Sequence, residues 1–444
     1  MRILHYILGF PPYRSGGLTN FSMDLMHAQL NSGDSVAALW PGTIKLISKR
    51  EKIVLRETID GIESYELVNP LPVPLDEGII DIEAFTKKAD INIYLEFLKS
   101  ISPDAIHIHT LMGMHKEFVL AAKQLGIRTI FTTHDYFGLC PKVTLFRNGR
   151  ACDEDHNCAD CKACNLKALS LKKITVLQSP VYRKLKETKI VKKIRKKHRN
   201  NFFNETEISD NTITQISHLK GDYQELRSYY IDILNAIDTI HCNSSLSMEI
   251  FNRYYKSDKY RIITISNKEI KRHSQNEYKP HDKLILLYLS PAKSYKGYML
   301  IRVALDELWA EGIRDFELHV YTNVEEDVPY LKVHKDGFSR NELENIFSNA
   351  DVLLAPSIWY ETFGFTVLEA LSYNLPVIVS DHVGSKDIIG DGGIIVSAGS
   401  KQELKKAIKS LSFDLCVKLR NNIIETAKIK TWDEYVKENQ SLYL

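Results

Sequence analysis

Short apolar runs alternate with amphipathic stretches along this chain, and the alternation occurs in two separate series. Between the runs, apolar residues recur at helical spacing, as Leu18, Phe21 and Leu25 do before Gly33. Alternation of this kind predicts parallel strands joined by helices that cover both faces of a sheet. The sequence therefore predicts an α/β fold with two doubly wound parallel sheets. The expected strands are residues 2–8, 35–40, 105–109 and 128–134 in the first series, and 284–290, 316–322, 351–357 and 376–381 in the second.

The length of the chain agrees with two domains, because 444 residues exceed the roughly 250–300 at which a single core stops growing. A polar stretch, 267–283, separates the two series, and we place the domain boundary between residues 255 and 280. Ligands of open α/β sheets bind outside the carboxyl ends of the strands. Two such domains that face each other form a cleft, and we expect the ligands there.

The composition indicates a globular protein without an overall charge that would attract nucleic acid. Hydrophobic residues make up 44% of the chain and charged residues 26%, with a net charge of +2. The first apolar run ends at Pro11-Pro12 without a small-residue cleavage site, so we interpret it as a strand and not as a signal peptide. No run approaches the roughly 20 apolar residues of a membrane span. We therefore expect a cytoplasmic protein.

A basic segment, 165–235, interrupts the strand and helix alternation. Within it, residues 181–200 carry ten Lys or Arg against one Glu. One interpretation is a solvated helix, and the other is an amphipathic helix that binds an anionic membrane surface. Nucleic acid is disfavoured as a partner, because no aromatic residues are interleaved with the charges. The apolar residues with the spacing of one helical face are Val181, Leu185, Ile190, Val191 and Ile194.

Two loops that follow predicted strands carry groups suited to phosphate. Gly16-Gly17 lies between the first strand and the first helix, where a ligand can approach the backbone and the positive end of the helix dipole. Lys293 and Lys296 follow the first strand of the second series, and lysine is a compact cation for phosphate oxygens. Each feature alone is also compatible with an ordinary turn or with surface lysines.

The stretch "ETFGFTVLEAL" places Glu361 before a predicted helix and Glu369 about one turn inside it. Two helical residues at this spacing would lie about 12 Å apart along the axis. Paired carboxyl groups in glycosidases lie about 5 to 9.5 Å apart. The spacing therefore favours two separate contacts along one extended ligand over an acid and base pair on one bond.

Five of the seven cysteines lie within 25 residues, and in a reducing compartment such a cluster favours metal binding over disulfides. A tetrahedral zinc site needs four thiolates, and we expect a structural zinc ion held by four of the five. Free or redox-active thiols and an iron–sulfur cluster are the alternatives. The cysteines are Cys140, Cys152, Cys158, Cys161 and Cys164.

The two glutamates, with the Phe-Gly turn after the first and a Pro-Val strand beyond the second, resemble the signature of retaining GT-B glycosyltransferases of family 4. The resemblance covers nearly the whole chain. Other stretches resemble family features in the same order and spacing. In the first domain, Gly16-Gly17 resembles the Gly-Gly loop, "PDAIHIH" (103–109) resembles the "PDIVH" strand, "TTHD" (132–135) resembles the strand end whose His faces the sugar, and "CNSS" (242–245) resembles the last strand of the N-terminal domain. Farther along the chain, Lys296-Gly297 resembles the donor lysine, and "TWDEYV" (431–436) resembles the final helix.

The resemblance implies a GT-B fold, with two Rossmann-like domains that face each other across a cleft. Residues 1–260 would form the acceptor-side domain, which contains the cysteine-rich loop 140–164 and the basic insertion. Residues 261–430 would bind the nucleotide-sugar donor, and residues 431–444 would pack back on the first domain as a helix.

The resemblance also implies roles for the site residues. The implied catalytic residues are Glu361 and His134, which would contact the donor sugar, and Lys296, which would hold the pyrophosphate. Glu369 would bind the ribose hydroxyls. The backbone amides from Phe363 to Thr366 would lie near the phosphates. The implied donor-binding residues are Gly16, Gly17, Lys293, Phe363, Gly364, Phe365, Thr366 and Glu369.

The implied activity is transfer of a hexose-type sugar, with retention, from a nucleotide-diphosphate sugar to a glycan or lipid-linked acceptor of a cell-surface polysaccharide such as lipopolysaccharide or capsule. Lysines and amide dipoles would stabilise the leaving phosphate, so no cofactor is required for catalysis. Binding of 181–200 to lipid would place the protein at the inner face of the plasma membrane.

One departure from the family pattern concerns the donor site. The family usually has an Arg five or six residues before the lysine, where this chain has Ser290 and Pro291. Lys293 would then substitute for the Arg. The departure keeps two alternatives open, a GT-B relative such as a nucleotide-sugar epimerase, and a catalytically weak binding or scaffold subunit.

Overall fold

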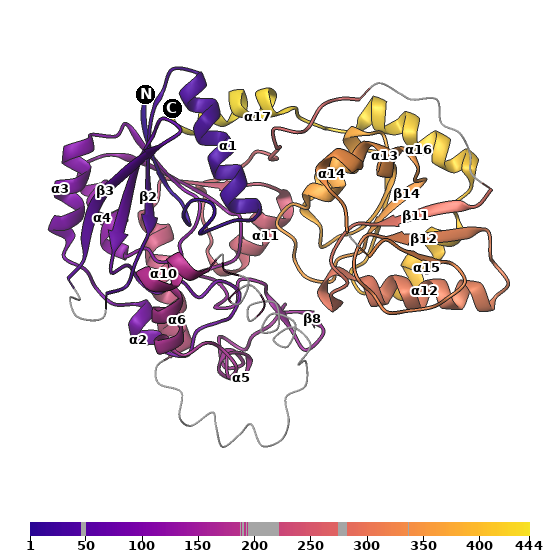
Figure 1. Cartoon of the computed structure of the whole chain (residues 1–444), viewed down its shortest axis with the longest axis horizontal. Coiled ribbons are helices and arrows are strands. Elements are labelled where there is room, and N and C mark those ends of the chain that lie inside the picture. Colours follow the sequence, from indigo (N-terminus) through magenta and orange to yellow (C-terminus); the bar gives the residue numbers. More distant parts are fainter. Residues whose placement is uncertain are drawn as a thin grey trace.

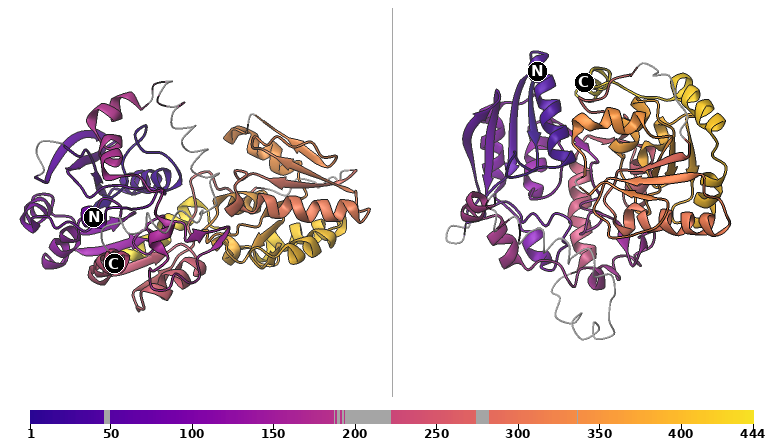
Figure 2. Two further views of the ribbon diagram at one scale, coloured as in Figure 1. Left: turned by 90° about the horizontal axis from the view of Figure 1, so that it is seen from below. Right: turned by 45° about the vertical axis from the view of Figure 1, so that its right-hand side comes forward.

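The computed structural model describes residues 1–45, 50–186, 188, 191, 193, 222–273, 282–335 and 337–444. It confirms the prediction of two α/β domains with parallel sheets (Figure 1). Figure 2 shows the two domains as separate bodies that meet along one side. Most of the basic stretch 181–200 lies outside the described residues, so membrane contact through it stays a prediction.

The first domain is built on a sheet of eight strands, which pair in parallel except for one antiparallel hairpin at the edge. That hairpin turns at Asp60-Gly61, where both residues have positive φ, as a tight two-residue turn requires. The order across the sheet is β10 (Tyr260–Ile262), β9 (Thr239–Cys242), β6 (Arg128–Thr132), β5 (Ala105–Ile108), β1 (Arg2–Tyr6), β2 (Ser35–Pro41), β4 (Ile62–Val68) and β3 (Lys52–Ile59).

Helices cover both faces of this sheet. Alternate residues of β1 point to opposite faces, so Leu4 packs in the same core as Phe118 of α4, and Ile3 packs in the core that includes Phe21 of α1. In the described residues of the first domain, the helices are α1 (Gly17–Asn31), α2 (Ile82–Phe85), α3 (Ile91–Ile101), α4 (Lys116–Gln124), α5 (Cys161–Cys164), α6 (Leu171–Leu177), α7 (Pro180–Leu185), α10 (Tyr223–Ala236) and α11 (Ser245–Tyr254). A small hairpin, β7 (Phe146–Arg147) and β8 (Arg150–Ala151), lies in the cysteine-rich loop.

The second domain has six parallel strands, and its sheet order reverses between β11 and β14. Strands β11, β12 and β13 run outward on one side of this point, and β14, β15 and β16 on the other, so the point is the topological switch of a doubly wound sheet. The strands are β13 (Leu331–Val333), β12 (Phe316–Val320), β11 (Leu284–Tyr288), β14 (Val352–Ala355), β15 (Val377–Ser380) and β16 (Gly393–Val396).

Two groups of helices cover the second sheet. Helices α12 (Tyr298–Ala310) and α15 (Lys401–Lys409) share one core with the sheet. Helices α13 (Leu343–Ser348) and α14 (Phe365–Ser372) share the other, and α16 (Phe413–Thr426) follows α15. None of the helices in the described part of the chain is long and apolar enough to span a bilayer.

The chain returns to the first domain through α17 (Trp432–Asn439), which lies against α1 (Figure 1). The helix begins with a capping box, in which Thr431 Oγ1 accepts from the Glu434 amide at 3.3 Å. Tyr435 is fully buried and packs against Phe21 of α1, with 5.6 Å between the ring centroids. The last turn reaches the first sheet, because the Tyr443 hydroxyl bonds the His107 ring on β5.

The connection between the two sheets begins within the range 255–280 that the sequence indicated. Strand β10 pairs with β9 in the first sheet, so this sheet extends to Ile262. The residues from Ile263 onward leave the sheet, and the second domain's first strand begins at Leu284.

We predict that Tyr435→Ala lowers the free energy of unfolding by about 3–5 kcal/mol, the usual cost of removing a buried aromatic ring. The reason is that Tyr435 fills the contact between α17 and α1. Urea unfolding followed by circular dichroism measures this loss. Lys437→Ala, on the exposed side of the same helix, is the control and should change little. Equal losses in both variants would contradict this account of α17.

Candidate functional site

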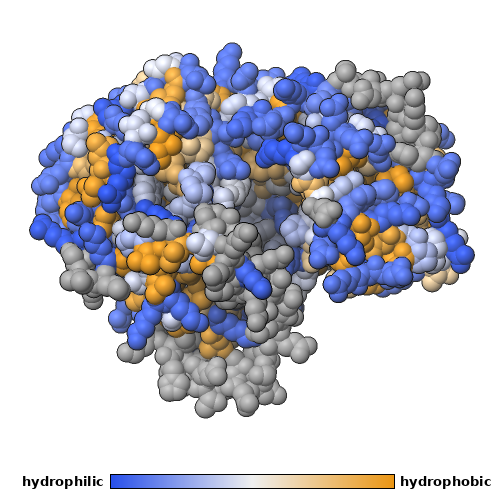
Figure 3. Space-filling view, viewed as in Figure 1, coloured by the Kyte–Doolittle hydropathy of each residue, from blue (hydrophilic) through white to orange (hydrophobic). Residues whose placement is uncertain are grey.

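The two domains contact each other through loops at the carboxyl ends of their parallel strands. Thr362, which follows β14, donates through Oγ1 to the His134 carbonyl after β6, at 3.1 Å. The Ser244 hydroxyl, which follows β9, donates to the Thr362 carbonyl at 2.6 Å. Figure 3 shows the surface hollowed where the two domains meet. This is the place at which open α/β sheets bind ligands.

An ion pair joins the two loops at the switch point of the second sheet. Lys296 follows β11 and Glu361 follows β14, and Lys296 Nζ lies 2.6 Å from Glu361 Oε1. The Ser357 hydroxyl donates to the other carboxylate oxygen at 2.8 Å. The side chains are only 14% and 22% exposed, so both charges are largely removed from water.

Glu361 is ionised in these surroundings. Burial acts to raise its pKa, but the Lys296 charge and the hydrogen bonds from Lys296 and Ser357 outweigh it, and the pKa is lowered from the usual value. The ammonium group of Lys296 also lies 5.0 Å from the centre of the Trp359 ring. A lysine ammonium has three donors, so Lys296 can hold Glu361 and still contact a ligand oxygen.

The Phe-Gly-Phe turn places the start of α14 beside this pair. Phe363 is buried, and Gly364 has φ of 102°, a conformation that side chains disfavour. A Cβ at Gly364 would also lie 2.9 Å from Val383 Cγ1. Helix α14 begins at Phe365, and the first amides of a helix, here those of Phe365 and Thr366, have no partner inside it. The turn therefore places helix amides without an intrahelical partner beside the Lys296–Glu361 pair, and a helix end of this kind is suited to an anion.

Glu369 lies one turn inside α14, in surroundings unlike those of Glu361. Its pKa is raised to about 7, because burial outweighs the opposing positive charge of Arg340 and Glu269 adds to the effect of burial. The two glutamates therefore differ in charge, since Glu361 is paired with a lysine and ionised while Glu369 is partly neutral at neutral pH.

His134 ends a chain of hydrogen-bonded histidines that crosses the first domain. Its Nε2 lies 3.3 Å from Nδ1 of His109, whose Nε2 lies 2.9 Å from Nδ1 of His5, and His5 bonds Gln29 at 2.7 Å. Burial lowers the pKa of His134 to about 3, so the ring is neutral. A neutral ring can form a hydrogen bond with a hydroxyl group, but it has no extra proton to transfer as a general acid at neutral pH. The sequence patterns did not indicate His5, Gln29 or Tyr443 as parts of this network.

The other predicted donor-binding residues lie at equivalent strand ends. Gly16 is the N-cap of α1, after β1, and nothing lies within 4 Å of a Cβ built on Gly16 or Gly17, so this backbone is open to a ligand. Lys293 is in the turn after β11, where its amide donates to the Pro291 carbonyl at 2.7 Å. The structure therefore brings Lys296 and Glu361 into direct contact, and places Gly16 and Gly17 on the opposite domain.

A second contact across the domains was not indicated by the sequence. Asp387 accepts from the amide and the hydroxyl of Ser245, both at 2.5 Å. Beside it, a Cβ at Gly384 would lie 2.4 Å from the Ser244 hydroxyl oxygen, so only glycine allows this approach. These bonds hold α11 of the first domain against the loop that follows β15.

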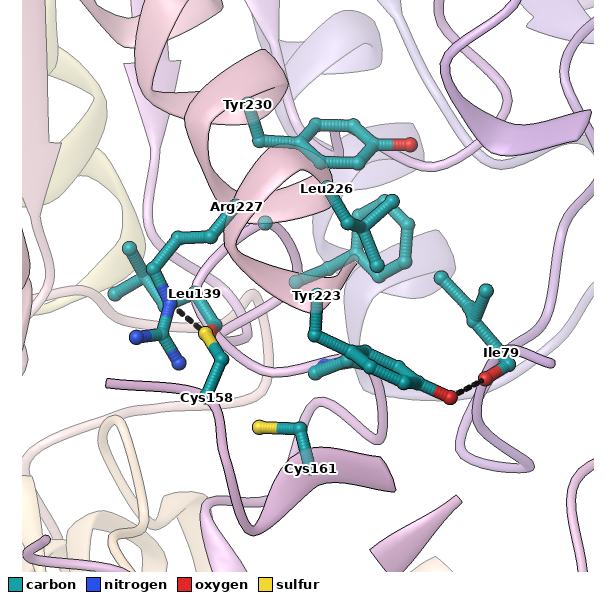
Figure 4. Close-up of a pocket in the computed structure, with 11 residues that line it drawn as sticks. Ile79, Leu139, Cys158, Cys161, Tyr223, Leu226, Arg227 and Tyr230 are labelled. Carbon is teal, nitrogen blue, oxygen red and sulfur yellow. Dashed lines mark hydrogen bonds between the residues drawn. The ribbon is translucent and has the colours of Figure 1, made fainter. Parts of the chain in front are cut away.

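The cysteine-rich loop lies on the same side of the molecule as these contacts. All seven cysteines are free of disulfides. Within the described part of the chain, ligand atoms of Cys158, Cys161 and Asp155 lie within 4.8 Å of one another, so this trio is a candidate metal-binding group. The prediction had included no acidic residue. Figure 4 shows the two thiols beneath Arg227 and Tyr223 of α10.

The model of the family "Glycosyl transferases group 1" matches residues 269–430. The matched range makes up most of the second domain. The switch-point pair, the Phe-Gly turn and Glu369 all lie within the residues that are similar to this family, 269–430.

The chain is similar to several curated proteins, each over part of its length. It is 29% identical to sucrose-phosphate synthase of Spinacia oleracea over 25% of this chain and 11% of that protein. It is 27% identical to an uncharacterized 41.2 kDa protein in the cps region of Klebsiella pneumoniae, over 31% and 40% of the two chains. It is 37% identical to the O-antigen chain mannosyltransferase RfbU of Salmonella typhimurium, over 16% and 20%. These matches span less than half of each relative.

Solved structures share the whole fold. Sucrose-phosphate synthase from Thermosynechococcus elongatus aligns with a TM-score of 0.55 at 14% identity, over 100% of this chain and 98% of that one. The UDP-forming α,α-trehalose-phosphate synthase from Burkholderia xenovorans, in complex with glucose-6-phosphate, aligns with a TM-score of 0.55 at 10% identity, over 100% of both chains. At these identities the likeness shows the fold alone, which is the predicted GT-B arrangement of two domains.

We predict that Lys296→Met lowers the free energy of unfolding by about 1–3 kcal/mol, because it leaves the Glu361 carboxylate largely buried without its cation. The double variant Lys296→Met with Glu361→Gln should recover part of that loss, which a double-mutant cycle from urea unfolding measures. Lys409→Met, in an exposed pair with Glu311, is the control and should have little effect. Purely additive losses would show that the pair is not coupled.

Proposed function

We propose that this protein is a retaining hexosyltransferase that moves a sugar from a nucleoside-diphosphate sugar to a glycan or lipid-linked acceptor in cell-surface polysaccharide biosynthesis. The observation that carries the proposal is the Lys296–Glu361 pair at the switch point of the second sheet. It combines a cation for phosphate and an anion for sugar hydroxyls within a group 1 glycosyltransferase domain.

The donor would lie along the second domain, with its phosphates in the middle. Lys296 and the amides at the start of α14 would bind the pyrophosphate, with Lys293 as a second cation. Glu369 would accept hydrogen bonds from the ribose hydroxyls at one end. Glu361 would hold the sugar at the other. Because lysine and amide dipoles are already present, a divalent metal between the phosphates is not needed in this proposal.

Catalysis in this arrangement depends on charge stabilisation. The bond between the anomeric carbon and the β-phosphate oxygen breaks, and its electron pair leaves with the nucleoside diphosphate. In this proposal, Lys296 and the α14 amides would face the β-phosphate oxygen on which this negative charge develops. Glu361 is ionised and His134 is neutral, so both orient sugar hydroxyls instead of donating protons.

The acceptor side is proposed from the first domain and from the relatives. The Salmonella relative is an O-antigen chain mannosyltransferase and the Klebsiella relative lies in a cps region, which supports a surface-polysaccharide acceptor. A lipid-linked acceptor fits the basic stretch 181–200, which would bind the inner face of the plasma membrane.

We predict that one nucleoside-diphosphate sugar from a panel raises the melting temperature of the protein, and that this sugar is transferred to an acceptor extract. Glu361→Ala should lower the rate of transfer at least about 100-fold, the scale for losing an oriented charged group at a reacting centre. Glu425→Ala, an exposed glutamate of the same domain, is the control. Chromatography of the products decides the class of reaction: epimerised donor without glycoside would indicate an epimerase. Binding with no turnover would indicate a scaffold subunit.

A second prediction concerns pH. Glu369 has a pKa near 7 before the donor binds, and only its charged form accepts both ribose hydrogen bonds. Donor affinity should therefore rise with pH and be about tenfold weaker at about pH 6 than at about pH 8, because each unit below the pKa lowers the ionised fraction about tenfold.

Calorimetry with the intact nucleotide sugar measures this dependence, because its pyrophosphate has no ionisation in that range. In Glu369→Gln the affinity should be lower and independent of pH. A wild-type affinity that is flat across this range would contradict the assignment of Glu369 to the ribose.

A further inference from the structure

We propose that four of the five cysteines between Cys140 and Cys164 bind one zinc ion, and that the loop held by this ion forms one wall of the donor site. The zinc site is independent of the proposed function, whereas the position of the loop at the donor site rests on that function. The evidence is the position of the thiols, the backbone of the loop, and two contacts that the loop makes with the second domain.

The cysteines come together from three parts of the loop. Cys140 follows β6, Cys152 follows β8, and the other three lie in or just before α5. Cys158 and Cys161 have ligand atoms within 4.8 Å of each other. Around zinc, with Zn–S bonds of about 2.3 Å, tetrahedral thiolates lie about 3.8 Å apart. The spacing of Cys158 and Cys161 therefore fits two thiolates on one tetrahedral metal ion.

Charge interactions place the remaining thiols in the same neighbourhood. Cys164 and Cys152 both interact with Cys140, and Cys140 interacts with Cys161. Burial raises the pKa of the Cys140 thiol to about 11. A metal ion would therefore bind there with release of the thiol proton.

Asp155 shapes this site but is not one of the proposed ligands. Its Oδ1 accepts from the Cys158 amide at 3.1 Å, and its Oδ2 pairs with Arg227 of α10. Arg227 also donates to the Leu139 carbonyl at 3.1 Å, as Figure 4 shows. Both carboxylate oxygens are therefore used to hold the Cys158 turn, while the thiols remain for the metal.

The backbone of the loop needs a cross-link of this kind. Of the eleven non-glycine residues with positive φ in the described chain, six lie between residues 143 and 158. Val143 is among them, and positive φ is disfavoured most for β-branched residues. Such conformations persist where the surrounding structure holds them. A metal with four ligands from the loop would supply that constraint.

The loop reaches the second domain next to the ion pair. The ring of Phe146 on β7 contacts Tyr295, the residue before Lys296, with centroids 5.9 Å apart. Asp153 accepts from the hydroxyl of Tyr360, the residue before Glu361. Arg253 of α11 binds the same Tyr360 hydroxyl at 2.9 Å and Asp153 at 3.2 Å. The loop therefore contacts the neighbours of both residues of the pair.

The metal is tested on the full chain purified with a reductant. Elemental analysis should find about one zinc per chain. After the metal has been removed with a chelator, titration of the protein with Co²⁺ should produce the absorption bands of tetrahedral thiolate coordination. Single Cys→Ser changes at the five positions should abolish these bands in four variants and spare them in the fifth. Cys416→Ser, outside the loop, is the control. Protein that holds no zinc and gives no cobalt bands, or that holds iron or forms disulfides instead, would overturn the proposal.

The wall of the donor site is tested separately, with zinc content measured in each variant. Phe146→Ala and Tyr360→Phe should keep one equivalent of zinc but raise the KM for the donor at least about fivefold, because the loop no longer supports the residues beside Lys296 and Glu361. Arg150→Ala, exposed on the same hairpin, should leave KM unchanged.

Chelation of the wild type should raise KM in the same way and restored zinc should reverse it. If metal-free protein still transfers the sugar with an unchanged KM, the loop does not form a wall of the donor site, while the proposed function stands. If no nucleotide sugar is transferred by any form of the protein, the proposed function fails, and the zinc result is still decided by the metal measurements.

Discussion

The Lys296–Glu361 ion pair is the interaction on which the arrangement of the site depends. It joins the loops that follow β11 and β14, the neighbouring parallel strands at which the strand order reverses. The pair therefore forms only if the second sheet adopts its observed order. The pair is largely buried, and burying a charge is favourable only when the partner is in place. Backbone bonds support it: the Ile358 amide donates to the Tyr295 carbonyl at 2.8 Å, and the Glu361 amide to the His382 carbonyl at 2.9 Å.

The first domain positions His134, its side chain at the site, through buried hydrogen bonds and not through ion pairs. His134 is connected through His109 and His5 to Gln29, which bonds the hydroxyl of Tyr443 at 2.9 Å. The last residues of the chain, reached after the return from the second domain, therefore complete a network that ends at the site. Because these rings are neutral and satisfied, the network can hold His134 in one orientation without the desolvation cost of a buried ion.

Much of the fold could be predicted from the sequence, because parallel strands in a doubly wound sheet leave a clear alternating pattern. All eight expected strands are present; seven are shorter than expected, and the strand expected at 35–40 extends to Pro41. The edge hairpin was missed, although Asp60-Gly61 between β-branched residues is a strong local signal for one. The partners of the site could not be predicted, since Asp153 and Tyr360 are 207 residues apart in the chain and meet only through the packing of the two domains.

The absent arginine and the cysteine-rich loop have a common physical consequence. In the proposed donor site, Ser290 and Pro291 stand where the family pattern would place an arginine, and Glu361 already balances the charge of Lys296, so a pyrophosphate would be attracted less strongly than by a site with that arginine. The attraction between a given pair of charges increases as water is excluded and the local dielectric constant falls. A loop that covers Tyr295 and Tyr360 would exclude water next to the pair. On the proposals above, the loop therefore strengthens the interactions that remain and offsets the missing charge.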